Sequence, residues 1–125
     1  MTKNQRNMLE LALINVRLDN VLQGDGRGIV YLRNEEKTQN EVFQEISNDV
    51  SSLWEMDDEA LLAHAEKVAN TDLDDMEHLE GYKDAPTFES YRDLLNYVRE
   101  DIDGGDLVNQ STLDVLYYQI KKEQN

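Results

Sequence analysis

Cysteine is absent from this 125-residue chain, and proline occurs once, at Pro86. Without cysteine there is no disulfide bond, no thiolate nucleophile and no zinc–thiolate site. A single proline leaves long stretches free to form helix, and six glycines separate them, mainly at 24–28 and 104–105. A chain of this length buries roughly two-thirds of its unfolded surface, which is enough for one core without crosslinks. We therefore expect one domain, residues 1–125.

Long apolar runs are also lacking. No stretch approaches the roughly 18–20 apolar residues that a membrane-spanning helix needs. The first residues lead into a segment that carries charges, which is unlike the apolar centre of a signal peptide. The lack of cysteine is typical of proteins in a reducing compartment. We expect no contact with a membrane and a cytoplasmic location, in the cytoplasm of the host if the protein is viral.

Basic residues are scarce in the middle of the chain. Residues 41–106 contain 20 acidic and four basic residues, a net charge of −16, whereas residues 1–40 carry +1 and residues 107–125 are neutral. This acidic block therefore accounts for the formal charge of −15. Such a field attracts partners of opposite sign and disfavours direct contact with nucleic acid or anionic lipid. The expected partner is a basic protein.

The apolar residues recur at three- and four-residue intervals, which is the period of amphipathic helices. Capping patterns at Thr38–Glu41 and Ser111–Asp114 mark two helix starts, and Gln23-Gly24 predicts a glycine-capped end for the first helix. The predicted helices cover about 4–22, 38–54, 57–70, 71–80, 87–102 and 111–120. Residues 29–32 suit either a short strand or an apolar strap. The predicted fold is all-α, a compact bundle of five or six short helices. Whether residues 29–32 form one short strand is left undecided.

Several patterns resemble known chemical sites, but each departs from what the chemistry requires. Residues 101–112 order their acids somewhat like a calcium loop, yet Thr112 occupies the position of the bidentate acid, so an acidic turn is favoured over weak calcium binding. The glycines at 24–28 follow a helix rather than a strand, which does not suit a phosphate loop. His78 has Asp74 and Asp75 beside it, but His64 has no such neighbour, so a paired carboxylate–histidine site does not form. We expect no cofactor, no metal and no enzymatic activity.

The leading hypothesis is that the acidic block imitates nucleic acid. Carboxylates three or four residues apart on a helix recur at about the spacing of phosphates along a strand. Acids that serve solubility alone are more often interleaved with lysines, whereas Lys67 is the only lysine or arginine between Glu55 and Glu80. The protein would then be an acidic inhibitor of the anti-restriction or anti-CRISPR kind, from a phage or mobile element, that blocks a DNA- or RNA-binding enzyme. Its predicted contact residues are Glu55, Asp57, Asp58, Glu59, Asp72, Asp74, Asp75, Glu77, Glu80, Asp101, Asp103 and Asp106.

A second hypothesis belongs to a different class. An antitoxin, immunity protein or adaptor could dock on a basic protein through the same face without imitating nucleic acid, with aromatic residues such as Trp54 and Tyr97 as anchors. A position in the core or at its rim is the simpler interpretation of these aromatics. The near-neutral N-terminal helix could also form a homodimer, although an ordinary core helix is favoured. The two hypotheses differ in whether carboxylates or anchors dominate binding.

Overall fold

A computed structural model of the chain describes residues 1–24, 30–69, 87–102, 105 and 107–124. Within these residues the chain forms five helices and one two-stranded antiparallel hairpin. The elements, in chain order, are α1 (Lys3–Val21), β1 (Leu22–Gly24), β2 (Val30–Leu32), α2 (Gln39–Glu55), α3 (Asp58–Val68), α5 (Tyr91–Asp101) and α6 (Val108–Gln124). The predicted all-α bundle is confirmed, and of the two alternatives left open near residues 29–32 the structure has the short strand, at Val30–Leu32. The helix predicted over 71–80 lies outside the described residues.

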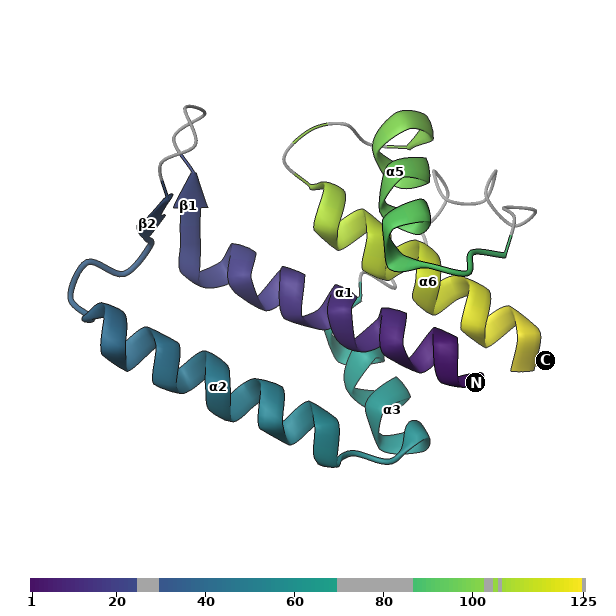
Figure 1. Cartoon of the computed structure of the whole chain (residues 1–125), viewed down its shortest axis with the longest axis horizontal. Helices are drawn as coiled ribbons and strands as arrows, with labels where there is room; N and C mark the ends of the chain where they lie inside the picture. The colour runs from purple at the N-terminus through teal and green to yellow at the C-terminus, as the bar shows by residue number, and fades with distance from the viewer. Residues whose placement is uncertain (25–29, 70–86, 103–104, 106, 125) are drawn as a thin grey trace.

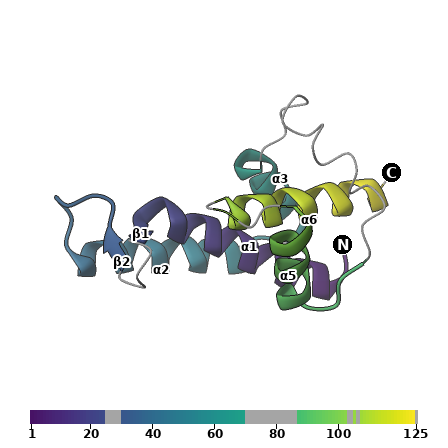
Figure 2. The same ribbon diagram turned by 90° about the horizontal axis from the view of Figure 1, so that it is seen from above.

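Helix α1 is the centre of the fold. Its most extensive contact is with α6, which runs antiparallel to it. Gln5 near the start of α1 donates to Glu123 near the end of α6 (2.6 Å), and Asn109 at the start of α6 donates to Asp19 near the end of α1 (2.9 Å). Helices α3 and α5 also pack on α6, and α2 lies along α1 (Figure 1). The hairpin and the start of α2 therefore lie at one end of the molecule, away from α5 and α6 (Figures 1 and 2).

The core is one cluster of apolar side chains, to which α1 and α6 contribute most. Its buried members are Met8, Leu9, Ala12, Leu13, Val16, Leu53, Leu61, Ala65, Ala69, Leu94, Val98, Leu113, Val115, Leu116, Tyr117 and Ile120. Burying each of the larger ones contributes about 1.5–3 kcal/mol. Helix α2 supplies only Leu53 to the buried members of this cluster. Its other apolar side chains lie outside the cluster. None of the described helices combines the length and the apolar character that a bilayer crossing requires.

Local capping explains where four of the described helices begin, and at α1 Thr2 and Gln5 form a capping box. Thr38 and Glu41 form the predicted capping box of α2, and Asp57 is the N-cap of α3, at the predicted start of that helix. Helix α5 begins later than predicted, at Tyr91 with Ser90 as its N-cap, rather than near Thr87. Both serine and threonine are good N-caps, so the sequence alone does not choose between them.

Helix α6 begins earlier than predicted, at Val108 instead of Ser111. Ser111 and Thr112 are buried inside the helix, and the Thr112 hydroxyl donates to the Val108 carbonyl oxygen at 2.7 Å. A threonine that bonds to the carbonyl four residues earlier is satisfied in mid-helix, so it does not mark a helix start. Part of the calcium-like segment, at residues 103, 104 and 106, lies outside the described residues.

The end of α1 also differs from the prediction. The chain does not stop at a glycine cap but becomes extended at Leu22 (φ −119°, ψ 150°) and continues into β1. The register of the hairpin pairs Leu22 with Leu32, Gln23 with Tyr31 and Gly24 with Val30. Arg33 N also donates to the Val21 carbonyl oxygen at 2.9 Å. Strand pairing therefore satisfies backbone groups that a glycine cap would otherwise have to satisfy.

Candidate functional site

Five of the twelve carboxylates predicted to contact a partner lie in the described part of the chain, at Glu55, Asp57, Asp58, Glu59 and Asp101. The other seven, Asp72, Asp74, Asp75, Glu77, Glu80, Asp103 and Asp106, lie outside it. Four of the five come together where α2 ends and α3 begins. We call Glu55, Asp57, Asp58 and Glu59 the junction carboxylates, and all four residues are exposed.

The junction carboxylates owe their positions to the local sequence. Glu55 is the last residue of α2, and the extended Met56 (φ −72°, ψ 140°) leads to Asp57, which accepts a hydrogen bond from Ala60 N at 2.7 Å. Asp58 and Glu59 lie in the first turn of α3, where the positive end of the helix dipole stabilises anions. The same residues therefore start a helix and present negative charge to solvent.

A cation from outside the acidic block reaches the junction. Arg6 of α1 pairs with Asp58 (Nη1 to Oδ1, 2.8 Å) and with Glu10 (Nε to Oε1, 3.0 Å). Its Nη2 also donates to the backbone oxygens of Met56 and, at 3.4 Å, Leu53. Hydrogen bonding to Asp58, and next to Glu10, raises the pKa of Arg6 above its ordinary value. Arg6 therefore neutralises one junction carboxylate and ties the end of α2 to α1.

The start of the acidic block is neutralised in the same way. Arg17 Nε lies 2.7 Å from Asp49 Oδ2, and Arg17 Nη2 lies 4.0 Å from Glu45 Oε2. Lys37 Nζ lies 2.5 Å from Glu45 Oε1. Both cations precede residue 41 in the sequence and reach α2 through tertiary contacts. The net charge of a sequence segment therefore overstates the negative charge on this part of the surface.

Glu55 and Glu59 differ from Asp58, because no ion pair joins them to another described residue. Asp101 differs in its location. It is the exposed last residue of α5, and α5 lies on the opposite side of α1 from α2 (Figure 1). The fold therefore brings four of the described carboxylates together and places Asp101 apart from them.

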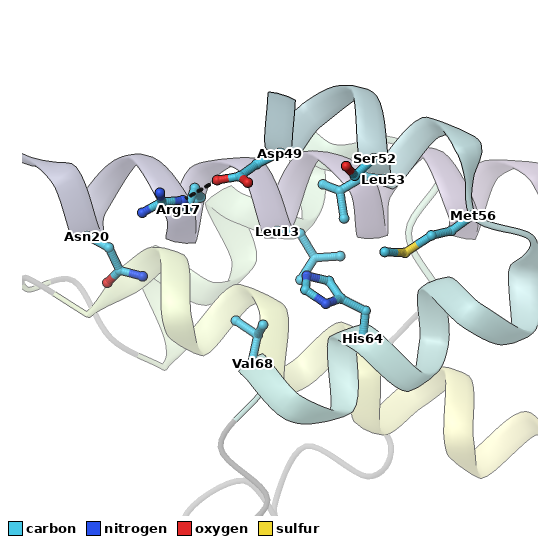
Figure 3. A pocket seen from close by; sticks show the side chains of 9 residues that line it. All are labelled: Leu13, Arg17, Asn20, Asp49, Ser52, Leu53, Met56, His64 and Val68. Atoms are coloured by element: carbon cyan, nitrogen blue, oxygen red, sulfur yellow. Dashed lines mark hydrogen bonds and ion pairs between the residues drawn. The ribbon is translucent and has the colours of Figure 1, made fainter. Parts of the chain in front are cut away.

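A cleft of about 250 Å³ opens between α1, α2 and α3 (Figure 3). Its lining consists of Leu13, Arg17, Asn20, Asp49, Ser52, Leu53, Met56, His64 and Val68. The Arg17–Asp49 ion pair lies on one side, and His64 points toward the middle (Figure 3). The described residues contain no group of three or more histidine, cysteine or acidic side chains that could hold a metal ion. Four of the nine lining side chains, Leu13, Leu53, Met56 and Val68, are apolar.

The aromatic residues of α2 are a feature that sequence reasoning missed. The pattern predicts that Trp54 lies in the core or at its rim and places Phe43 on the apolar side of α2, but their exposures are 62% and 58%. At about 100° per residue, Phe43, Val50 and Trp54 lie within about 40° of one another on the helix, and we call them the α2 stripe. The buried Val42 and Leu53 lie about 80–100° away around the helix. The sequence does carry a signal for this exposure. The apolar side chains of α2 span about 120° around the helix, which is wider than one neighbouring helix covers.

Comparison with known proteins adds no relative. No protein-family model matches the chain, and neither a curated protein nor a solved structure matches it. Function is therefore inferred from the charge, exposure and contacts of the described residues.

Proposed function

We propose that the protein is an acidic inhibitor that binds a basic, nucleic-acid-binding protein and occupies the groove where that protein holds phosphates. The observation that supports this most is the formal charge of −15 together with four exposed carboxylates on adjoining helix ends. In the sequence the acids continue beyond the junction through Asp72–Glu80. An enzyme of the restriction or CRISPR kind as target, and a phage or mobile element as source, belong to this proposal.

Inhibition of this kind is stoichiometric. Opposite charge speeds the encounter, and a small number of desolvated pairs then hold the complex. Glu55 and Glu59 suit this role because no described cation competes for them. Asp58 suits it less, since Arg6 already holds its carboxylate.

The test requires the partner itself, captured from host lysate at low salt and identified by mass spectrometry. Anisotropy of a labelled DNA duplex bound to the purified partner then reports whether this protein displaces the duplex. We expect displacement, and we expect it to weaken as the salt concentration rises from about 50 to about 200 mM. Simultaneous binding of the duplex and this protein would contradict mimicry.

A pair of charge-reversal variants separates the junction from net charge. Glu55→Lys with Glu59→Lys changes two exposed junction carboxylates, and Glu35→Lys with Glu36→Lys makes the same change of net charge in the loop before α2. We expect the junction variant to bind the partner about tenfold or more weakly, and the loop variant to lose much less affinity. Equal losses would show that only net charge matters.

A second candidate function is supported by the α2 stripe and by the pairing of Glu45 and Asp49 with cations. In this case the protein is an antitoxin, immunity protein or adaptor that docks on a basic protein without entering its nucleic-acid site. Aromatic anchors then dominate the affinity. Trp54→Ala would weaken binding more than the junction charge reversal, and the duplex would remain bound to the partner.

A further inference from the structure

Helix α2 is attached to the rest of the molecule less extensively than α1. Twelve of its 17 residues are exposed, and Val42 and Leu53 are its two buried residues, whereas α1 buries six of its 19. Among the described helices, the one extensive contact of α2 is with α1. A segment with few buried apolar contacts opens at a lower free energy than the core around it.

The two ends of α2 are held in different ways. At the C-terminal end, Leu53 belongs to the buried core cluster, Met56 packs against that cluster, and Arg6 donates to the backbone oxygens of both residues. Toward the other end, Val42 is buried but lies outside the cluster, and Ile46 is only partly buried. The core therefore holds α2 mainly at its C-terminal end.

Between these ends, ion pairs of Arg17 join α2 to α1. Arg17 Nε lies 2.7 Å from Asp49 Oδ2, and Arg17 Nη2 lies 4.0 Å from Glu45 Oε2. The three side chains are 36–50% exposed, and ion pairs in contact with water are individually weak. Arg17 and Asp49 also line the cleft of about 250 Å³, so close packing does not support their ion pair on that side (Figure 3).

The chain on both sides of α2 permits movement of the helix. In the loop before α2, Lys37 N and Glu36 N both donate to Asn34, so these hydrogen bonds stay within the loop. The Lys37 ammonium group pairs with Glu45 of α2 itself, so this ion pair does not join the helix to α1. After α2, the backbone is extended at Met56.

We propose that α2 opens away from α1 as a unit while the other helices stay packed, with residues 34–37 and Met56 as the hinges. Opening separates Arg17 from Asp49, so the open form presents a carboxylate that the closed form neutralises. A basic partner that binds Asp49 then favours the open form, because a ligand shifts an equilibrium toward the state that it binds better. That last step rests on the proposed function, whereas the opening is a property of the chain alone.

Hydrogen exchange of single backbone amides, followed by NMR, tests the opening. After correction for intrinsic rates, we expect the amides of residues 43–52 to share one rate, about tenfold or more above the rates at 9–16 and 113–120. Low urea should speed exchange at 113–120 more than at 43–52, since opening of α2 exposes less surface than global unfolding. Equal rates in α1, α2 and α6 would overturn the inference. Rates graded inward from both ends of α2 would show fraying and overturn it as well.

A matched pair of substitutions on α1 tests the role of Arg17. Arg17→Gln removes the ion pairs to α2, and Lys3→Gln removes the same charge from an exposed lysine that has no ion pair with a described residue. We expect Arg17→Gln to speed exchange at 43–52 about two- to fivefold without changing 113–120, and Lys3→Gln to change neither. Equal effects of the two substitutions, or an equal increase at 43–52 and 113–120, would contradict the proposal.

A thiol reporter gives a second measurement, because the chain contains no cysteine. Val42→Cys places a thiol on the buried side of α2, and Val98→Cys places one in the core on α5 (3% and 0% exposed). We expect a thiol reagent to modify Val42→Cys about tenfold or more faster than Val98→Cys, and Arg17→Gln to increase the difference. Equal rates would mean that Val42 is uncovered only by global unfolding, which rejects the opening. None of these measurements uses a partner, so they decide the opening whether or not the protein displaces a duplex.

Discussion

At the scale of single residues, Arg6 determines how the junction between α2 and α3 is built. Its side chain is 19% exposed and contacts two carboxylates and two backbone oxygens. The backbone oxygens of Leu53 and Met56 belong to the end of α2, where carbonyl groups lack partners within the helix and a positive charge is favourable. A guanidinium group supplies several donors in one plane, which the single ammonium group of lysine does not.

Replacing Arg6 should therefore destabilise the protein more than replacing an exposed cation. We expect Arg6→Ala to lower the free energy of unfolding more than the control below does, because it leaves carbonyl and carboxylate groups without their donor. Arg6→Lys should recover only part of this loss. Arg17→Ala, which removes the ion pairs of a more exposed side chain (36% against 19%), is the control and should cost less than about 1 kcal/mol. Urea unfolding followed by circular dichroism measures all three, and equal costs for Arg6→Ala and Arg17→Ala would show that the backbone contacts contribute nothing.

At the scale of elements, the starts of the helices show what the sequence does and does not determine. The start of α2 could be predicted because Thr38 and Glu41 form both halves of its capping box. The start of α5 could not, since Thr87 and Ser90 are both suitable caps. Tertiary contacts hold the preceding residues: Asn4 Nδ2 donates to the Glu89 carbonyl oxygen (2.7 Å) and the Phe88 and Tyr97 rings lie 5.2 Å apart. A helix boundary that depends on such contacts cannot be predicted from the local sequence alone.

In the candidate site, too, some features could be predicted from the sequence and others could not. The junction carboxylates could be found from sequence because they adjoin the predicted helix start at about residue 57. Their ion pairs could not, because Arg6 lies 52 positions before Asp58 and meets it only through the packing of α1. The exposure of Trp54 was hidden for a related reason. Its spacing is that of a core residue, and only the position of α1 decides which side of α2 is covered.

The two sides of α2 should therefore differ in their effect on stability. Leu53 belongs to the buried core, and Leu53→Ala should lower the free energy of unfolding by about 2–4 kcal/mol, from lost apolar contact and the remaining cavity. Phe43 is 58% exposed, and Phe43→Ala should cost less than about 1 kcal/mol despite the larger side chain. Urea unfolding of the two variants checks this. Similar costs would mean that Phe43 packs in the fold and is not available for docking.

At the scale of the whole molecule, fifteen net negative charges act on both folding and binding. Self-repulsion destabilises the compact state, whereas the same field attracts a basic partner. Salt screens both effects, since the Debye length falls from about 30 Å at 10 mM to about 8 Å at 150 mM ionic strength. The ion pairs of Arg6, Arg17 and Lys37 respond in the opposite direction, but partly exposed pairs are individually weak.

We therefore expect the melting temperature to rise with sodium chloride over this range while affinity for the partner falls. Glu55→Lys with Glu59→Lys changes the net charge from −15 to −11 and should show a smaller rise, because less repulsion remains to be screened. Thermal unfolding by circular dichroism measures both proteins. A melting temperature that falls with salt would show that the ion pairs outweigh the repulsion. Calcium chloride at equal ionic strength separates screening from binding, because an additional rise with calcium would indicate an ion held by the acidic segments, including residues 101–112.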